Sequence, residues 1–439
     1  MLLESPHVGV DPQPDVRAGV LTRRTFRTFE HRPVPAAIRV SVLDTARFAL
    51  AVDDADTVRF IVLDDAELKR RLFRLTRESK DISNHWEGLF KPSGLRGYVQ
   101  YWPNTPFCVA VCADPAAGPR HIHNGWNHHI ASAAATENLA LAARWHGMAL
   151  VMYTHFSQEK LKRLLDVPFD WEVMGVMGVG YPDLRRTNPQ VLEASLVRLP
   201  LAELVSAERH GQAAADVAGL EGSPPHGRPV PDLMETMLAL GTSREFREDP
   251  VDPGDLFDIL RAGQWAPSAG NFQPLRYVVM RDREQLGRLE ALARESREIS
   301  GHWLSRYRDG FSEHPHWSRV PAAIALIADP ARGGPHIHGE ATHVHAGGLS
   351  AQNMSLIAHA LGLGTTLVTH WIEEKVKVLI DCPRTWDLVG VMPVGVPVQR
   401  LPRRPLPLAD IVLQDSFGRP WEATREHPFR ASVSPTPEI

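Results

Sequence analysis

The chain contains two copies of one sequence pattern, and this internal repeat constrains its fold more than any other feature. Shifting the 439-residue sequence by 217 places aligns Pro14 with Pro231 and Phe29 with Phe246. The same register aligns "ESKDISNHW" with "ESREISGHW", and after a slip of two residues it aligns "TENLALAARWHGM" with "AQNMSLIAHALGL". Such a chain is expected to form two similar units that pack against each other.

The boundaries of the copies follow from where the alignment holds. We expect a first unit at 12–205, a second unit at 231–413 and a C-terminal tail at 414–439. Residues 206–230 are rich in Ala, Gly and Pro, which is typical of a linker. This linker is long enough for the two units to pack side by side.

Each copy has the same order of expected elements. A short helix and a basic turn come first, followed by a second helix, a loop and a strand. A His-rich segment, a long helix with apolar residues at 3.6-residue spacing, and strands ending in "GVGYP" or "VGVP" complete the copy. This order predicts an α+β fold in which helices pack on a mainly antiparallel sheet in each unit.

Composition argues against several classes of protein. A formal net charge of −4 with 23% charged residues gives no sign of a nucleic-acid or membrane-surface partner. The three cysteines, Cys108, Cys112 and Cys382, are too few for a disulfide framework, so we expect a cytoplasmic protein. No apolar run approaches the roughly 20 residues that cross a bilayer, so we expect neither membrane insertion nor secretion.

Four motifs occur in a fixed order, and together they indicate a family. They are "R-T-x-R-x-F-x-x-x-P-V", "A-P-S-A-G-N-x-Q-P", "E-N-L-x-L-A-A" and "V-G-Y-P". In this order they resemble the FMN-dependent nitroreductase family, here as a tandem pair in one chain. The resemblance implies two nitroreductase-like units that form an intrachain pseudo-dimer in place of the family's homodimer, and hence a monomer.

The resemblance also implies where FMN binds. In the family one unit supplies a basic turn for the phosphate, and the other supplies a Pro-Ser-x-x-Asn loop along the ribityl chain and ring. Arginines and a helix-terminal hydroxyl suit a phosphate, and small loop residues let backbone donors approach the flavin. Carried over residue by residue, these cofactor contacts fall on Arg24, Thr25 and Arg27 of the first copy and on Pro267, Ser268, Ala269, Asn271 and Gln273 of the second.

The two copies have lost complementary halves of this site. The second copy's turn reads "GTSR" from Gly241 and lacks the first arginine. The first copy's loop has lost its binding groups, because Leu50, Ala51, Asp54 and Asp56 replace Pro267, Ser268, Asn271 and Gln273. We therefore expect one composite FMN site per chain. The structural alternatives are helix-end cations for the arginines and a capped loop with Asn271 in a left-handed turn.

Further groups are assigned by the same resemblance. The segment that offers backbone N–H groups near the flavin's reactive nitrogen falls on Thr154 and His155, and His155 is a candidate catalytic residue. A basic residue beyond the last strand reaches the phosphate in the family. We assign this role to Arg198, with Arg185 and Arg186 as alternatives.

Two histidine-rich segments, "HIHNGWNHH" and "HIHGEATHVH", have three interpretations. In the family this region of the partner unit covers the flavin, which makes His343 a candidate acid–base catalyst and places His336, His338 and His345 in the substrate pocket. A surface cluster is the second interpretation. The His-x-His spacing also suits zinc, iron or copper, but no cysteine or acidic triad accompanies it, so we expect no metal.

The leading hypothesis for function is an FMN-dependent oxidoreductase that acts on a dedicated small-molecule substrate. Loss of one site argues against a generalist enzyme, and NADH or NADPH is the candidate electron donor. The sequence leaves open whether the substrate is reduced or dehydrogenated. The alternative is a non-catalytic flavin-binding or flavin-sequestering protein of degenerate tandem type.

Overall fold

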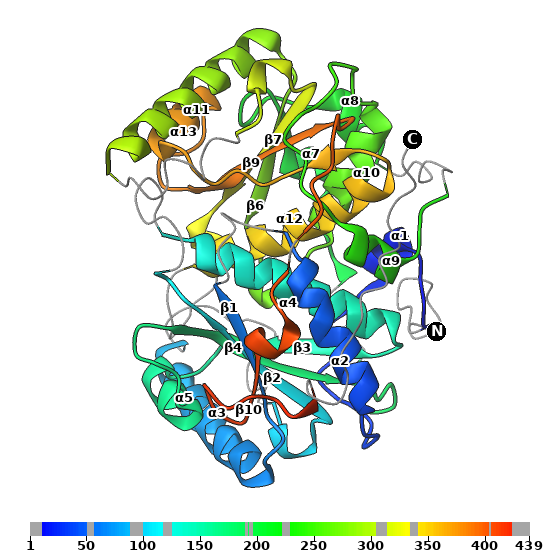
Figure 1. Cartoon of the computed structure of the whole chain (residues 1–439), viewed down its shortest axis with the longest axis vertical. Coiled ribbons are helices and arrows are strands. Elements are labelled where there is room, and N and C mark those ends of the chain that lie inside the picture. The colour runs from blue at the N-terminus through cyan, green and yellow to red at the C-terminus, as the bar shows by residue number, and fades with distance from the viewer. Residues whose placement is uncertain are drawn as a thin grey trace.

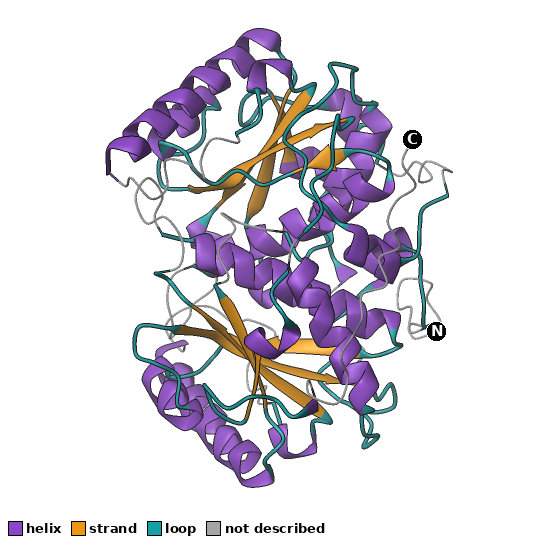
Figure 2. Ribbon diagram, in the orientation of Figure 1, coloured by secondary structure: helices purple, strands orange, loops and turns teal. Residues whose placement is uncertain are grey.

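The arrangement of the chain comes from a computed structural model, in which two sheets flank a central layer of helices (Figure 1). The structure describes residues 11–50, 57–87, 100–116, 125–188, 192, 196–221, 229–303, 314–333, 341–403 and 405–423. Figure 2 shows that further helices cover the outer face of each sheet. The predicted α+β fold with two similar units is confirmed.

The two five-stranded sheets have matching topologies. The first has the strand order β10–β1–β2–β4–β3, and the second has the order β5–β6–β7–β9–β8. Neighbouring strands are antiparallel, except that β10 pairs with β1 and β5 with β6 in parallel. The strands span β1 Val58–Val62, β2 Phe107–Ala113, β3 Ala149–Tyr153, β4 Glu172–Gly180, β5 Val205–Ala207, β6 Leu275–Met280, β7 Ala322–Ala328, β8 Gly364–Thr365, β9 Asp387–Gly395 and β10 Val412–Gln414.

The α-helices recur in the same order in both repeats. Those of the first repeat are α1 Val16–Thr22, α2 Ala36–Asp44, α3 Ala66–Glu87, α4 Asn127–Trp145 and α5 Gln158–Leu165. Their counterparts are α9 Leu233–Ala239, α10 Pro253–Gln264, α11 Arg283–Trp303, α12 Thr342–Ala360 and α13 Glu373–Leu379. Short helices α7 Leu201–Leu204, α8 Ala215–Ala218 and α14 Leu408–Ile411 lie in the connecting and C-terminal segments.

Strand residues alternate between two cores. Phe60 and Val62 of β1 belong to the large inner core that also contains residues of α4 and α12. Ile61 lies on the opposite face, in a smaller core with Leu72 of α3 and Leu161 of α5. Because both faces are covered, central strands such as β2 and β7 are apolar throughout rather than alternating with polar residues.

Helices α4 and α12 cross at the centre of the molecule (Figure 1). Both are buried on nearly all sides, beyond the single apolar face that the spacing predicted. A Cβ on Gly348 of α12 would lie 2.5 Å from the carbonyl oxygen of Ile130 and 2.7 Å from Cβ of Ala133, both on α4. The close crossing therefore depends on glycine at this position.

Each repeat completes the sheet of the other. Strand β5, from the end of the first repeat, pairs Val205 with Tyr277 in the second sheet, and β10 pairs Val412 with Phe60 in the first. The expected linker at 206–230 therefore begins inside a strand and also contains α8. The expected tail begins inside β10, and Trp421 within it is buried in the inner core. Three-residue strands leave no periodic pattern, so the sequence did not reveal them.

The cysteines and the apolarity of the helices can be compared with the expectations from composition. All three cysteines are buried and free. Burial raises the pKa of Cys108 to about 11 and that of Cys112 to about 12, so both stay protonated as core residues of β2. Among the described helices, none has both the length and the apolarity to cross a membrane.

Candidate functional site

The basic turn that follows α1 is buried. Arg23 and Arg24 are only 5% and 4% exposed. Arg23 Nε donates a hydrogen bond to Oε1 of Glu137 on α4 over 3.1 Å. Arg24 Nη1 donates to the carbonyl oxygens of Leu21 and Arg23 at 2.8 and 2.7 Å. The Nε and Nη2 groups of Arg24 are buried and have no hydrogen-bond partner among the described residues.

Trp265, from the second repeat, lies against two arginines of the first. The guanidinium carbons of Arg24 and Arg198 lie 4.5 and 4.7 Å from its ring centroid. Burial is the main cause that lowers the pKa of Arg24 to about 9, and the charges of Arg23, Arg198 and Arg144 lower it further. Burial, then Arg23, lowers the pKa of Arg198 to about 10. We call these four residues, Arg23, Arg24, Arg144 and Arg198, the arginine cluster.

The loop at 265–274 adopts the backbone that its composition predicts. Gly270 and Asn271 have φ values of 58°, and Gln273 has a φ value of 50°. This left-handed region favours Gly and is tolerated by Asn, so Asn271 has the left-handed conformation that the structural alternative named. Ser268 stands at the N-cap position of a 3₁₀ turn without capping it. Its Oγ instead accepts a hydrogen bond from the Gln273 N–H at 3.0 Å, which closes the loop.

The amide side chains of the loop hold the end of the first repeat. Asn271 Oδ1 accepts a hydrogen bond from Arg198 Nη1 at 3.2 Å, and its Nδ2 donates to the carbonyl oxygen of Val197 at 3.0 Å. The Leu199 N–H donates to Gln273 Oε1 at 2.8 Å. The loop therefore fixes Arg198 beside Trp265, a positioning role that the sequence analysis did not foresee.

Of the three arginines left open beyond the last strand of the first repeat, Arg198 is the one in the cluster. Arg185 and Arg186 are exposed, and their backbone N–H groups donate to the Asp183 carboxylate. The crossed arrangement thus brings Arg24 and Arg198 of the first copy to the loop of the second. Arg198 differs from Arg185 and Arg186 because it lies shortly before β5, and β5 pairs with β6 of the second sheet.

Other predicted residues lie around the same turn. Thr25 forms a parallel bridge with Leu150, which ties the turn to β3. Thr154 and His155 directly follow β3 and are half-buried, as are Thr25 and Arg27. The predicted loop residues Pro267, Ser268 and Ala269 are also half-buried.

The opposite pairing of turn and loop has a different environment. A Cβ on Gly241, the counterpart of Arg24, would lie 2.8 Å from the Leu401 carbonyl oxygen, so the backbone leaves no room for an arginine there. Arg244 contributes to lowering the pKa of His314 to about 3, after burial, His370 and Arg297. The loop residues Ala51, Asp53, Asp54 and Asp56 lie outside the described residues.

The described histidines are not a surface cluster. His343 is 1% exposed, and its Nε2 lies 2.5 Å from Oδ2 of Asp387. This geometry favours a positioning role for His343 over the direct acid–base role expected from sequence. His345 is half-buried near the start of α12, while His336 and His338 lie outside the described residues.

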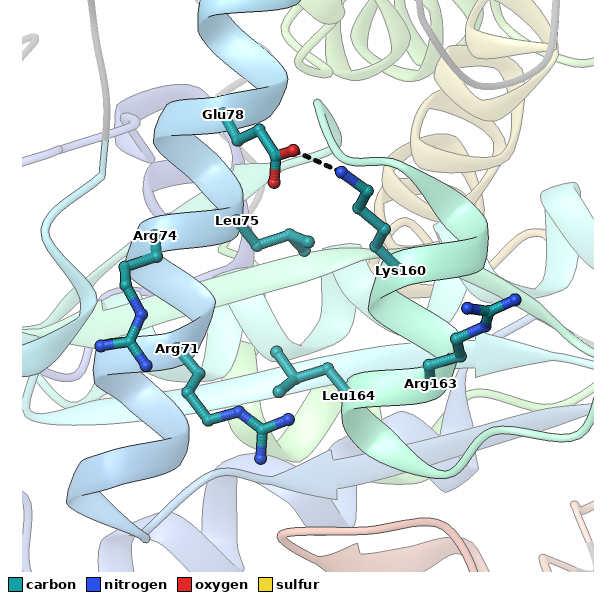
Figure 3. A pocket seen from close by; sticks show the side chains of 7 residues that line it. All are labelled: Arg71, Arg74, Leu75, Glu78, Lys160, Arg163 and Leu164. Atoms are coloured by element: carbon teal, nitrogen blue, oxygen red, sulfur yellow. Dashed lines mark hydrogen bonds and ion pairs between the residues drawn. The ribbon is translucent and has the colours of Figure 1, made fainter.

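A basic groove lies between α3 and α5 (Figure 3). Its volume is about 310 Å³, and none of the predicted site residues lines it. Lys160 forms an ion pair with Glu78, and Arg163 forms one with Glu159. Because its cations are exposed and several are paired, this groove is a solvated face rather than a buried site.

Sequence reasoning missed three residues that shape the candidate site. Arg23 and Glu137 form its buried ion pair, and the ring of Trp265 lies against two of its arginines. The consecutive arginines Arg23 and Arg24 could have indicated this site from the sequence, because two neighbouring positive charges favour the binding of an anion. Trp265 gave no signal by itself, since its role depends on residues far away in the sequence.

A comparison with protein families decides the relationship. The model of the nitroreductase family matches residues 20–181 and again 241–396. The chain belongs to the nitroreductase family. The two matched segments coincide with the two repeats, so this is a tandem nitroreductase-family protein.

Individual relatives match about one repeat of this tandem nitroreductase-family chain. The 5,6-dimethylbenzimidazole synthase of Rhodospirillum rubrum is 27% identical over 198 residues, covering 42% of this chain and 86% of the relative. A putative NADH dehydrogenase/NAD(P)H nitroreductase of Archaeoglobus fulgidus is 26% identical, covering 37% and 83%. The solved structure of a putative nitroreductase from Desulfovibrio desulfuricans, in complex with FMN, is 26% identical with a TM-score of 0.30, covering 41% and 94%.

Proposed function

We propose that this protein is an FMN-dependent oxidoreductase with one flavin site between its two repeats. The observation that carries this proposal is the arginine cluster beside the loop at 265–274, in which Arg24 has two buried donor groups without a described partner. Burying like charges together is unfavourable unless an anion balances them. The phosphate of FMN would supply both the charge and the hydrogen-bond acceptors. Membership of the nitroreductase family supports this cofactor.

The residues divide by the part of FMN that they fit. The phosphate would be held by Arg24, Arg27, Arg198 and the Thr25 hydroxyl. Three of these residues belong to the basic turn, and Arg198 lies against the same Trp265 ring as Arg24. The ring of Trp265 lies against both Arg24 and Arg198 and helps to hold their guanidinium groups in place. A bound phosphate would therefore meet fixed donors rather than mobile side chains.

The loop and the end of β3 fit the rest of the cofactor. The small residues Pro267, Ser268 and Ala269 let backbone groups approach the ribityl chain and ring. Thr154 offers a backbone N–H near the ring, and the half-buried His155 can hold a proton beside it. When bound, FMN supplies hydride-transfer chemistry, which we assign to a dedicated small-molecule substrate with NADH or NADPH as the electron donor.

The cofactor content of the purified chain tests the composite site. FMN titration, followed by fluorescence quenching, should saturate at about one flavin per chain, because only one basic turn keeps both arginines. Saturation near two would show that the opposite pairing also binds flavin. Colourless protein that takes up no added FMN would remove the proposal altogether.

Anaerobic mixing with NADH or NADPH separates an enzyme from a flavin-sequestering protein. If the protein is an enzyme that uses a nicotinamide cofactor, the yellow absorbance of the bound flavin should disappear after mixing. Flavin that binds stoichiometrically but stays oxidised with both nucleotides would favour storage or a dehydrogenase that needs its own substrate. Bleaching by dithionite alone is the control that the bound flavin is redox-active.

A further inference from the structure

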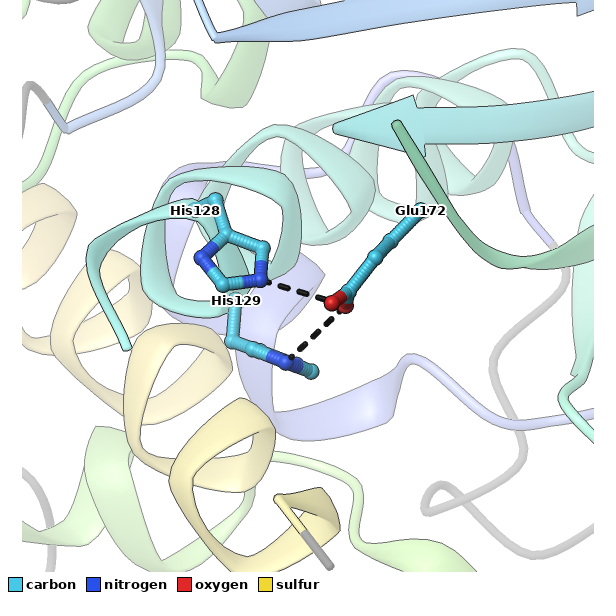
Figure 4. Close-up of side chains that lie close together, drawn as sticks. All are labelled: His128, His129 and Glu172. Carbon is cyan, nitrogen blue, oxygen red and sulfur yellow. Dashed lines mark hydrogen bonds and ion pairs between the residues drawn. The ribbon is translucent and has the colours of Figure 1, made fainter. Parts of the chain in front are cut away.

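A cluster of two histidines and one glutamate lies at the start of α4 (Figure 4). His128 and His129 are in its first turn, and Glu172 is the first residue of β4. The Nε2 atoms of His128 and His129 lie 3.2 and 3.5 Å from the same carboxylate oxygen, Oε2 of Glu172. One donor atom from each of the three residues lies within 4.8 Å of the other two. Two imidazoles and a carboxylate thus converge on one point.

These distances suit a metal ion. Two histidines and a glutamate are a donor set that zinc uses in proteins. With metal–ligand distances of about 2.0–2.1 Å, neighbouring ligand atoms of a tetrahedral site lie about 3.3–3.4 Å apart. The two Nε2–Oε2 separations bracket this value. His128 is only 6% exposed, so its ring is already held where a ligand must be.

The equivalent position of the second repeat serves as an internal comparison. There, His343 and Asp387 form the same helix-to-strand contact at 2.5 Å, but Val344 stands where the first repeat has His129. One histidine and one carboxylate are therefore sufficient to tie the helix to the sheet. The second histidine of the first repeat is an addition that this structural role does not require.

A fourth group from the second repeat lies nearby. His345 of α12 is close enough to His129 for its charge to contribute to lowering the pKa of His129, after burial and His128. The next residue of α4, Ile130, contacts α12, because a Cβ on Gly348 would lie 2.5 Å from its carbonyl oxygen, so the cluster is next to the crossing of the two central helices. The side chain of Glu172 is 40% exposed, so solvent reaches the cluster. A metal ion here would link α4 to β4 next to the boundary between the repeats.

We propose that His128, His129 and Glu172 bind one divalent transition-metal ion of the zinc type. This site shares no residue with the proposed flavin site, and the proposal does not depend on flavin binding. It also departs from the sequence-based expectation of no metal, which rested on the absence of accompanying acidic ligands. Glu172 supplies that ligand from 43 positions beyond His129 in the sequence.

Metal titration of the full-length chain, without a histidine tag and after EDTA treatment, tests this site. Calorimetry with Zn²⁺ at pH 7.5 should show one equivalent with a dissociation constant of about 1 µM or tighter. Co²⁺ should give the intense visible bands of a tetrahedral site. Absence of stoichiometric binding, or cobalt without those bands, would overturn the proposal without affecting the flavin site, since no FMN is present.

Variants assign the ligands. His129→Ala and Glu172→Gln should each weaken Zn²⁺ binding by at least about a hundredfold. His146→Ala is the matched control at the other end of α4, where its Nε2 is hydrogen-bonded to Ser41, and it should bind as the parent does. Circular dichroism checks that each variant is folded. Unchanged binding in folded His129→Ala or Glu172→Gln would place the ion elsewhere, and the parent titration decides the case if a variant fails to fold.

Discussion

At the scale of single residues, the candidate flavin site is defined by positive charge that the described residues balance only in part. Glu137 pairs with Arg23, and burial raises the pKa of this carboxyl. Within the part of the chain that the structure describes, Arg24 has no acidic partner, and its hydrogen bonds use Nη1 alone. An anion that binds here meets weakly solvated donors, so each contact is stronger than at the surface.

The two basic turns should differ in their effect on FMN affinity. Arg27→Ala should lower it about ten- to hundredfold, because one charge-assisted contact is worth about 1.5–3 kcal/mol. Arg244→Ala, at the equivalent position of the second copy, should change it little, since that turn lacks the first arginine. Fluorescence titration of both variants measures this, and equal losses would contradict a single crossed site.

The loop should act on FMN partly through Arg198. Arg198→Ala should weaken binding by ten- to hundredfold, and Asn271→Ala by about tenfold, because the amide holds the guanidinium at 3.2 Å. The double variant should then be no weaker than Arg198→Ala, which a double-mutant cycle of titrations reports. Strictly additive losses would mean that Asn271 contacts the cofactor independently.

Buried histidine should make the fold sensitive to mild acid. The folded-state pKa of His314 is about 3, against 6.5 ordinarily, mainly because of burial. As pH falls below 6.5 the unfolded chain binds this proton and the folded chain does not. Stability is therefore lost from pH 6.5 down to about 3, at up to about 1.4 kcal/mol per pH unit.

His314→Gln should flatten this acid dependence. The measurement is the urea concentration at the midpoint of unfolding, at pH 7 and at pH 5. The difference between the two midpoints is compared among the proteins, so that any pH-independent effect of the substitution on stability cancels. His316→Gln, at an exposed position two residues away, should retain the parent's slope. A slope that is the same in all three proteins would show that His314 does not titrate as described.

At the scale of elements, the crossing of α4 and α12 sets the geometry of the interface. Ala133 of α4, Ala266 of the loop and Leu349 of α12 form one small buried cluster. The helix crossing and the candidate site are therefore in direct contact. A change that separates the helices would also displace the start of the loop.

Two Gly→Ala substitutions test the crossing. Gly348→Ala should destabilise the protein by about 1–3 kcal/mol, because the new methyl group meets the Ile130 carbonyl oxygen at 2.5 Å. Gly287→Ala in α11 has no atom within 4 Å of the new methyl group and should stabilise by up to about 1 kcal/mol. Urea denaturation measures both, and a stabilised Gly348→Ala protein would mean that the helices can move apart at no cost.

At the scale of the whole molecule, the two repeats share one hydrophobic core. A single inner core contains Leu43 and Leu141 of the first repeat together with Leu256 and Leu356 of the second. Strands β5 and β10 add a second link, since each pairs with the other repeat's sheet. The inner faces of the two repeats are therefore covered by each other within the chain.

Separated repeats should not fold alone. Residues 12–205 and 231–413, expressed singly, should lack a cooperative unfolding transition, and co-expression should restore it. The intact chain should run as a 48.8 kDa monomer in light scattering. A stable isolated repeat would contradict the shared core, and a tight dimer of intact chains would contradict the internal pairing.

Several features followed from the sequence because they depend on local residues. The repeat fixed two units, and the 3.6-residue spacing identified α4 and α12. Gly270 and Asn271 indicated a left-handed turn, since few residues tolerate positive φ. The loss of arginine at Gly241 predicts two unequal sites, and this stays a prediction.

Other features were decided by tertiary structure, because they join residues that are distant in the chain. Arg198, and not Arg185 or Arg186, lies beside Trp265 because β5, which follows it, pairs with the second sheet. A strand of three residues is too short to show a periodic pattern in the sequence. Glu172 meets His128 only through the packing of α4 on its sheet. Local patterns encode backbone conformation, whereas register and packing decide which side chains share a site.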